Sequence, residues 1–232
     1  MNDFDFLAEL GTGSFGETFK VKERSSGKFF ALKTIPAKRS TDPKGQDREA
    51  TLAFSEALRL ASLQHPNLVM IHGAFIDRVT IGTVMQREVP RVSIVMDYCD
   101  GGDLRKYYRE QPDPLDEARV LQLLQPMLSG LAYIHAKRVV HRDIKSENVL
   151  LSSGDVVKIA DFGLAKKEDS LSKTQRAGTP LYMSPEANAG HAHAPADIFA
   201  LAIIAIELAT KAWPSNILST DAQVSPSRAL LQ

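Results

Sequence analysis

The chain has 232 residues, 44% of them hydrophobic, and its 28 Lys and Arg residues balance 28 Asp and Glu residues. This length can bury a sizeable core in one large domain or two small lobes, and the balanced charge excludes a general attraction to nucleic acid or to an anionic membrane. The single cysteine, Cys99, excludes an internal disulfide framework and a structural zinc site built on cysteines, and it is compatible with a reducing compartment.

The N-terminal stretch MNDFDFLAEL carries acidic residues where a signal peptide would carry basic ones. The longest apolar run extends only from Ile198 to Ile206, which is too short to cross a membrane. We therefore expect a protein of the cytoplasm or the nucleus.

The first part of the chain has mainly strand character. Short apolar segments alternate with polar ones over residues 5–35, with a turn at RSSGK, which predicts an antiparallel hairpin followed by a third strand. Helical spacing predicts a helix over 47–63. Strand signals return at 68–76 and 92–98, separated by a polar loop around 77–91.

The remainder is mainly helical. Apolar spacing predicts a helix over 115–135, with a kink at Pro126, and two short strands follow at 148–152 and 156–160. After a polar loop over 161–186, residues 196–210 are apolar nearly all round, which predicts a buried helix. The layout is an α+β protein in which a small β-rich lobe precedes a mainly helical lobe.

The stretch LGTGSFGETF places Gly11, Gly13 and Gly16 at the spacing of a loop that cradles phosphates. A dinucleotide fold would continue into a helix, but ETFKVKE alternates like a strand. A Walker loop would need Lys and then Ser or Thr after the last glycine, where this chain has Glu17. The remaining design is a hairpin lid followed by a lysine on the next strand, here Lys33 in FALK. The glycines alone would also fit an ordinary turn.

Three downstream motifs make the pattern specific: HRDIKSENVLL at 141–151, DFG at 161–163 and GTPLYMSPE at 178–186. With these motifs in this order, the chain resembles a eukaryotic protein kinase of the serine/threonine type. The segments IVMDYCDGGDL and HPNLV are most similar to the NIMA-related group. The resemblance implies a bilobal protein-kinase fold.

The resemblance also implies domain boundaries. It gives a kinase domain over 4–213, with an N-terminal lobe at 4–96 and an incomplete C-terminal lobe at 97–213, and a weakly structured tail at 214–232. In the family Glu186 pairs with an arginine from a late helix, and the only arginine after it here is Arg228. We therefore expect a shortened C-terminal lobe, as in a fragment or in a domain that needs a partner.

The family's chemistry assigns roles to particular side chains. Asp143 would orient the substrate hydroxyl, and Lys145 would offset charge on the transferred phosphoryl group. Asn148 and Asp161 would supply the oxygen ligands that Mg²⁺ prefers. Lys33 would hold the α- and β-phosphates of ATP. Its anionic partner would be Glu56, with Glu49 as the less favoured alternative.

The resemblance implies an adenine pocket and a phosphate lid on the N-terminal side. Met96 would lie at the back of the pocket, and the backbones of Asp97 and Cys99 would bind the adenine edge. The pocket walls would be Leu10, Thr18, Ala31 and Leu150, and the lid would comprise Gly11, Thr12, Gly13, Ser14, Phe15, Gly16 and Glu17.

Regulation is implied by Arg142, which precedes the catalytic aspartate. An arginine there can pair with a phosphate on the activation loop and order that loop. Thr174 is the preferred phosphate acceptor, with Ser170 and Ser172 as alternatives. Hydroxyls that simply contact solvent are the other interpretation.

Other polar residues have structural interpretations. We expect His141 and Asp197 to support the catalytic loop, and Thr179 to contact that loop. His191 and His193 could suggest a metal site, but two histidines without further ligands are more typical of a polar loop.

The sequence therefore predicts a serine/threonine protein kinase that uses ATP and Mg²⁺ and acts on Ser and Thr hydroxyls of protein substrates. An activating kinase or autophosphorylation would supply the regulatory phosphate, and neither nucleic acid nor a membrane is expected as a partner. The alternative is a kinase-like regulatory module that binds nucleotide or protein with weak or no turnover. A nicotinamide enzyme ranks third, since no helix is predicted after Gly16.

Overall fold

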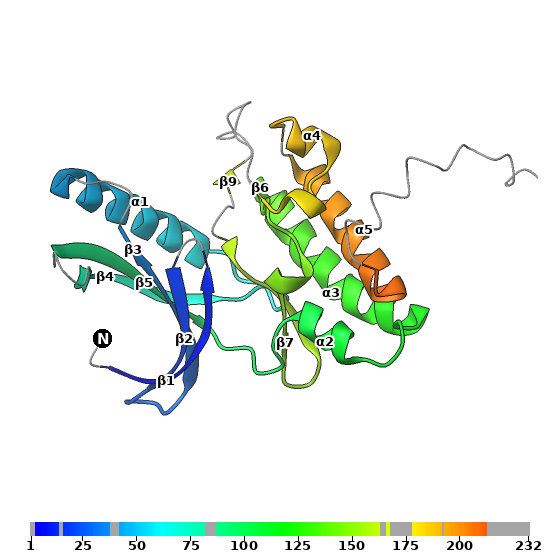
Figure 1. Cartoon of the computed structure of the whole chain (residues 1–232), viewed down its shortest axis with the longest axis horizontal. Helices are drawn as coiled ribbons and strands as arrows, with labels where there is room; N and C mark the ends of the chain where they lie inside the picture. The colour runs from blue at the N-terminus through cyan, green and yellow to red at the C-terminus, as the bar shows by residue number, and fades with distance from the viewer. Residues whose placement is uncertain are drawn as a thin grey trace, which may run out of the picture. The chain divides into compact units, whose positions relative to one another are not determined.

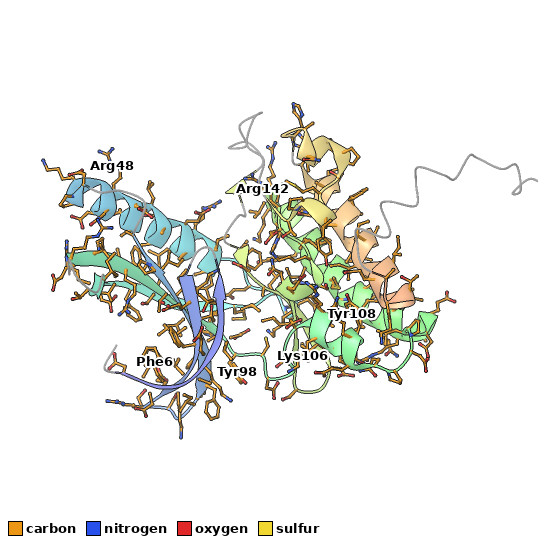
Figure 2. All side chains as sticks on the ribbon, viewed as in Figure 1. Phe6, Arg48, Tyr98, Lys106, Tyr108 and Arg142 are labelled. Atoms are coloured by element: carbon orange, nitrogen blue, oxygen red, sulfur yellow. The ribbon has the colours of Figure 1, made fainter. Side chains whose placement is uncertain are left out.

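The structure is a computed structural model that describes residues 3–13, 16–37, 42–81, 87–162, 166–167, 178–191 and 193–212. The chain divides after Asp100 into two units, Met1–Asp100 and Gly101–Gln232. Figure 1 labels their elements, and Figure 2 adds the side chains. Among the residues labelled in Figure 2, Phe6 on the first strand and Arg48 on the first helix are exposed.

The first unit is a five-stranded antiparallel sheet with one helix, as the sequence predicted. The strand order is β1-β2-β3-β5-β4, so the first three strands form a meander and β5 lies between β3 and β4. Val21, Leu32 and Val95 form a buried cluster in this sheet. The elements are β1 (Phe4–Gly13), β2 (Gly16–Glu23), β3 (Phe29–Pro36), α1 (Pro43–Ala61), β4 (Ile71–Ile81) and β5 (Arg87–Asp97).

Gly16 begins β2 at a point where only glycine fits. Its φ of +143° and its position place an added Cβ only 1.9 Å from the Thr34 carbonyl oxygen of β3. A side chain there would collide with the backbone of the neighbouring strand. The close approach lets the hairpin tip lie against β3.

Helix α1 begins at Pro43, four residues before the predicted start. The Asp42 side chain accepts a hydrogen bond of 2.9 Å from Gly45 N, and proline occupies the first helical position. Both features are helix-start signals, which the apolar spacing did not include. Ala50 packs with Val92 of β5, so the buried face of α1 covers the sheet.

The predicted polar loop at 77–91 is wrong, because most of it belongs to β4 and β5. The two strands pair in antiparallel fashion, with Ile71 opposite Met96 at one end and Ile81 opposite Arg87 at the other. Asp77 lies opposite Arg91, whose Nε donates to Asp77 Oδ1 at 2.9 Å. Charged side chains that pair across strands look like a loop in the sequence, although they stabilise the ladder.

The second unit is mainly helical. Helices α3 and α5 pack along each other (Figure 1), and β7 and β8 form the predicted hairpin. The short helices α2 and α4 were not predicted. The elements are α2 (Leu104–Glu110), α3 (Glu117–Ala136), β6 (Val139–Val140), η1 (Ser146–Asn148), β7 (Val149–Ser152), β8 (Val156–Ile159), β9 (Lys166–Lys167), η4 (Pro180–Tyr182), α4 (Pro185–Asn188) and α5 (Ala194–Thr210).

Helix α5 is largely buried, as predicted. Leu201, Ile204 and Leu208 are almost fully enclosed, whereas Ile198 and Ile206 are exposed. One side of the helix therefore remains open among the described residues. None of the helices in the described ranges has both the length and the apolar character needed to cross a membrane.

Candidate active site

Asp197 of α5 holds the backbone of the loop that follows β6. Its Oδ2 accepts hydrogen bonds of 2.9 Å from His141 N and 2.8 Å from the His135 ring, and its Oδ1 accepts one of 2.9 Å from Arg142 N. Asp197 is 1% exposed, so these donors replace water around a buried carboxylate. This confirms the predicted supporting role of Asp197.

His141 is the second support of the loop and is fully buried. Its Nε2 lies 3.0 Å from the Ala160 carbonyl oxygen and must donate to it, so its Nδ1 can accept the bond of 3.3 Å from Asp143 N. This pattern assigns the neutral tautomer with the proton on Nε2. The ring also packs on Phe162, with centroids 4.9 Å apart, and so connects Asp143 to the segment that carries Asp161.

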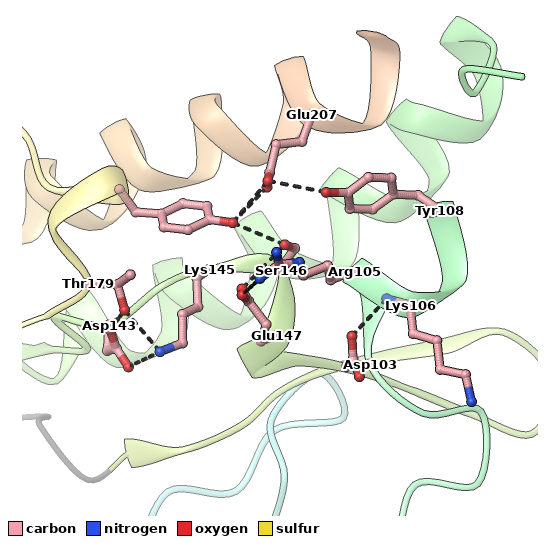
Figure 3. Close-up of polar contacts among 11 residues, drawn as sticks. Asp103, Arg105, Lys106, Tyr108, Asp143, Lys145, Ser146, Glu147, Thr179 and Glu207 are labelled. Atoms are coloured by element: carbon pink, nitrogen blue, oxygen red, sulfur yellow. Dashed lines mark hydrogen bonds and ion pairs between the residues drawn. The ribbon is translucent and has the colours of Figure 1, made fainter. Parts of the chain in front are cut away.

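Asp143 belongs to a polar cluster, and Figure 3 shows its contacts with Lys145 and Thr179. Asn148 Nδ2 donates to both its backbone oxygen (2.8 Å) and its Oδ2 (2.9 Å). Lys145 Nζ lies 3.0 Å from the same Oδ2. The Thr179 hydroxyl donates to Oδ1 at 2.8 Å and accepts from Lys145 Nζ at 2.9 Å. The structure thus brings three predicted site residues together and confirms that Thr179 contacts the loop.

The backbone around this cluster adopts uncommon conformations. Arg142 and Asp161 have φ of +73° and +59°, in the left-handed region that non-glycine residues seldom occupy. At Gly178, φ is +120° and an added Cβ would lie 2.4 Å from the Arg142 carbonyl oxygen. The segment that carries Thr179 therefore contacts the loop that follows β6 through its backbone as well as its side chain.

A buried carboxylate next to this cluster was missed by the sequence reasoning. Glu207 of α5 is fully buried and accepts from the hydroxyls of Tyr182 (3.0 Å) and Tyr108 (3.2 Å), while the Ser146 hydroxyl lies 3.1 Å from that of Tyr182. Burial raises the pKa of Glu207, and the three hydroxyls oppose that rise. A single acidic residue in the apolar run AIIAIELAT was the available signal.

A small pocket opens beside Asp143 within the second unit. It lies between the loop that follows β6, the segment of Thr179 and α5, and its walls include Met183, Ala196 and Ala200.

In the first unit, the predicted phosphate lid forms the β1–β2 hairpin. Gly11 lies opposite Thr18, Thr12 opposite Glu17, and Gly13 opposite Gly16. A strand therefore follows the glycines, as the hairpin lid requires and a dinucleotide fold does not.

The predicted residues of the adenine pocket share neighbouring strands. Thr18 lies opposite Lys33 of β3, and Ala31 lies opposite Met96 of β5. Leu10 is exposed on β1.

Asp97 and Cys99 lie where β5 ends. Asp97 uses its side chain within the unit, accepting from Met70 N at 3.2 Å and lying 2.7 Å from the His72 ring, and Cys99 is buried. In the second unit, Leu150 belongs to β7.

Glu56 lies on α1, as predicted, and contacts a cation of its own helix. Its Oε1 is 3.3 Å from Arg59 NH2, one turn further along, and both side chains are more than a third exposed. The pairing of Glu56 with Lys33 stays a prediction.

The chain matches the family model described as protein kinase domain over residues 4–228. It belongs to the protein kinase family. The elements of the described ranges, an antiparallel sheet with one helix followed by a mainly helical unit, agree with that assignment.

Curated relatives are serine/threonine kinases and related enzymes that are much longer. An interferon-induced, double-stranded RNA-activated protein kinase of Mus musculus is 35% identical over 89% of this chain and 40% of its own length. Serine/threonine-protein kinases Nek5 and Nek1 of Mus musculus are each 33% identical, over 92% and 90% of this chain and 32% and 16% of theirs. The chain is thus about as similar to the double-stranded RNA-activated kinase as to the Nek kinases, so these identities do not single out the NIMA-related group.

Several residues with predicted roles lie outside the described residues. These are Ser14 and Phe15 of the lid, Gly163 of DFG, and the candidate phosphate acceptors Ser170, Ser172 and Thr174. Within the described part of the chain, no group of three or more His, Cys, Asp or Glu side chains lies close enough to hold a metal ion. That includes the surroundings of His191 and His193.

Proposed function

We propose that the chain is a serine/threonine protein kinase that transfers the γ-phosphate of ATP to Ser and Thr hydroxyls of protein substrates. Lys145, Asn148 and Thr179 all contact the carboxylate of Asp143, and this arrangement supports the proposal. Phosphoryl transfer needs positioning and charge neutralisation more than covalent chemistry, and this cluster combines an acceptor for a hydroxyl with a nearby cation.

In the proposed reaction, the substrate hydroxyl binds to Asp143, which orients its oxygen towards the γ-phosphorus. The new bond joins this oxygen to phosphorus as the bond to the β–γ bridging oxygen breaks, so ADP is the leaving group. The hydroxyl proton passes to Asp143. Lys145, 3.0 Å from Asp143, offsets negative charge on the transferred group.

The residues present fit a magnesium ion that binds together with nucleotide. Both Nδ2 hydrogens of Asn148 are used by Asp143, so its amide orientation is set and its Oδ1 is the atom available as a ligand. Asp161 would add a carboxylate, and phosphate oxygens and water would complete the octahedron that Mg²⁺ prefers. When bound, the ion neutralises charge on the ATP phosphates.

We propose that the first unit binds ATP. The backbone N–H groups of the hairpin from Gly11 to Glu17 would face the phosphates, and Lys33 would hold them with its charge. Ala31 and Met96 would contact the base. Support comes from the strand after the glycines and from the register that sets Thr18 opposite Lys33.

Regulation by phosphate is part of the proposal. Arg142 is 7% exposed and immediately precedes Asp143; burial lowers the pKa of its guanidinium, and the charge of Asp197 opposes that shift. A phosphate on Thr174 would give this buried cation a second anion. Replacing Thr174 with Ala should lower the activity of a phosphorylated preparation to that of a dephosphorylated one, and equal activity of all preparations would exclude this mechanism.

The decisive experiment measures γ-phosphate transfer from magnesium-ATP to a mixture of acidic and basic proteins. We expect Asp143→Asn to lower the rate by about 10²- to 10⁴-fold while ATP still raises the melting temperature. The matched control is Asp155→Asn, an exposed site that should retain the wild-type rate. Stabilisation of the wild type by magnesium-ATP without any transfer would instead favour a binding module. We assign the kinase to the cytoplasm or nucleus, consistent with its one cysteine.

A further inference from the structure

We infer that Arg105 determines substrate specificity by binding Glu147, so that the kinase gains nothing from basic residues beside the phosphate-accepting hydroxyl. The inference rests on the proposed kinase activity and concerns its substrate class. Its basis is an ion pair next to the catalytic loop for which the phosphoryl-transfer chemistry has no use.

Glu147 lies beside the residues that would orient the substrate hydroxyl. It lies in η1 between Ser146, whose hydroxyl is 3.1 Å from that of Tyr182, and Asn148, which donates to Asp143. Its side chain is 33% exposed, so a substrate could reach it. An open carboxylate at this position would attract lysine or arginine side chains of a substrate.

Arg105 already occupies that carboxylate. It projects from α2, and its NH1 contacts Glu147 Oε1, as the close-up in Figure 3 shows. The Arg105 side chain is only 23% exposed, which favours a persistent pair over a mobile surface contact. Its positive charge offsets the negative charge of Glu147, so a basic substrate residue would gain little attraction there.

Two further acids near the cluster are also used internally. Asp103 accepts from Lys106 N at 2.8 Å and caps α2, and Glu207 is buried beneath two tyrosine hydroxyls. The Lys106 side chain points away from Glu147 and is exposed (Figure 3). Among the described residues around the cluster, Glu147 is thus paired, Glu207 is enclosed and Asp103 holds its own helix with one oxygen, so we expect substrates with neutral or acidic residues around the hydroxyl.

The test compares serine peptides that carry either arginine or alanine at each position from five residues before to four residues after the serine. For the wild type, the ratio of kcat/KM between arginine and alanine peptides should be near or below one at every position. In Arg105→Ala, we expect the ratio at one position to rise about fivefold, as for one new exposed ion pair. Adding Glu147→Gln to Arg105→Ala should cancel the gain.

Lys106→Ala is the matched control, because it removes a cation from the same helix without touching Glu147, and its ratios should equal those of the wild type. If Arg105→Ala does not fold, Arg105→Gln takes its place in the same peptide comparison. A wild type that already favours arginine, or an active Arg105 variant with unchanged ratios, would overturn the inference and leave the kinase activity standing. Absence of transfer to every peptide and protein would overturn both.

Discussion

A hydrogen bond of 2.8 Å joins the Thr179 hydroxyl to Oδ1 of Asp143, although 36 residues separate them in the chain. Lys145 lies within 3.0 Å of both side chains. The three groups form a closed triangle, so each one limits the position of the other two.

Replacing Thr179 with Val should therefore impair the reaction. The methyl group keeps the shape but leaves Asp143 and Lys145 without their shared hydroxyl, and a displaced carboxylate should lower kcat about 10- to 100-fold. Steady-state kinetics with a protein substrate would measure it. Thr179→Ser restores the hydroxyl and should recover most of the rate, and Thr51→Val, on an exposed turn of α1, should have no effect. A Val variant as active as the Ser variant would contradict this role.

Asp197→Asn should destabilise the second unit despite its nearly identical shape. One carboxylate oxygen becomes an NH₂ group that faces the N–H of His141 or Arg142, which leaves a buried donor unpaired at a cost of about 1 to 3 kcal/mol. Urea unfolding would report the loss. Asp155→Asn is the control, since Asp155 is 65% exposed and its φ of +62° also suits asparagine. Equal unfolding free energies for the two variants would rule out the buried support.

Gly16→Ala and Gly11→Ala should differ in stability although both alter the same hairpin. At Gly16 a Cβ would lie 1.9 Å from the Thr34 oxygen at a φ of +143°, whereas nothing lies within 4 Å of a Cβ at Gly11. We expect Gly16→Ala to lower the free energy of unfolding by about 1 to 3 kcal/mol and Gly11→Ala to leave it nearly unchanged. Thermal melting without nucleotide would compare them, and the reverse order would refute the close approach.

The raised pKa of Glu207 predicts a pH dependence of stability. Burial disfavours its charged form, so its contribution to stability is complete below the ordinary value of 4.5 and is lost as the pH rises through the raised folded value. Glu207→Gln carries no such charge. Relative to the wild type, this variant should gain stability as the pH rises above about 4.5. Denaturant titrations at several pH values would measure the difference. Glu110→Gln, the same substitution at a site 64% exposed, is the matched control.

The sequence was most informative where chemistry and local spacing coincide. Asp143, Lys145 and Asn148 lie within a few residues of each other, and their residue types already imply oxygen ligands and a cation. The glycine hairpin was predictable because Glu17 excludes a Walker loop and a strand-like segment follows. Residues at the hairpin tip and in the activation loop lie outside the described residues, so their roles stay predictions.

Contacts between distant residues could not be predicted from spacing. Tyr108 and Glu207 are 99 residues apart, and only the packing of α2 and α5 brings their side chains together. The strand pairing of Asp77 with Arg91 was read as a loop because both residues are charged, and their attraction appears only once the strands are adjacent. In both cases a polar residue has a partner that the local sequence does not reveal.

The crowding around Asp143 also restricts how a hydroxyl can reach it. A carboxylate offers about four lone-pair directions, two on each oxygen. Asn148 and Lys145 use both directions on Oδ2, and Thr179 uses one on Oδ1. Among the contacts of the described residues, a single direction on Oδ1 is left for an incoming serine or threonine. The direction from which a substrate hydroxyl can approach is thus set by one remaining lone pair on Oδ1 of Asp143.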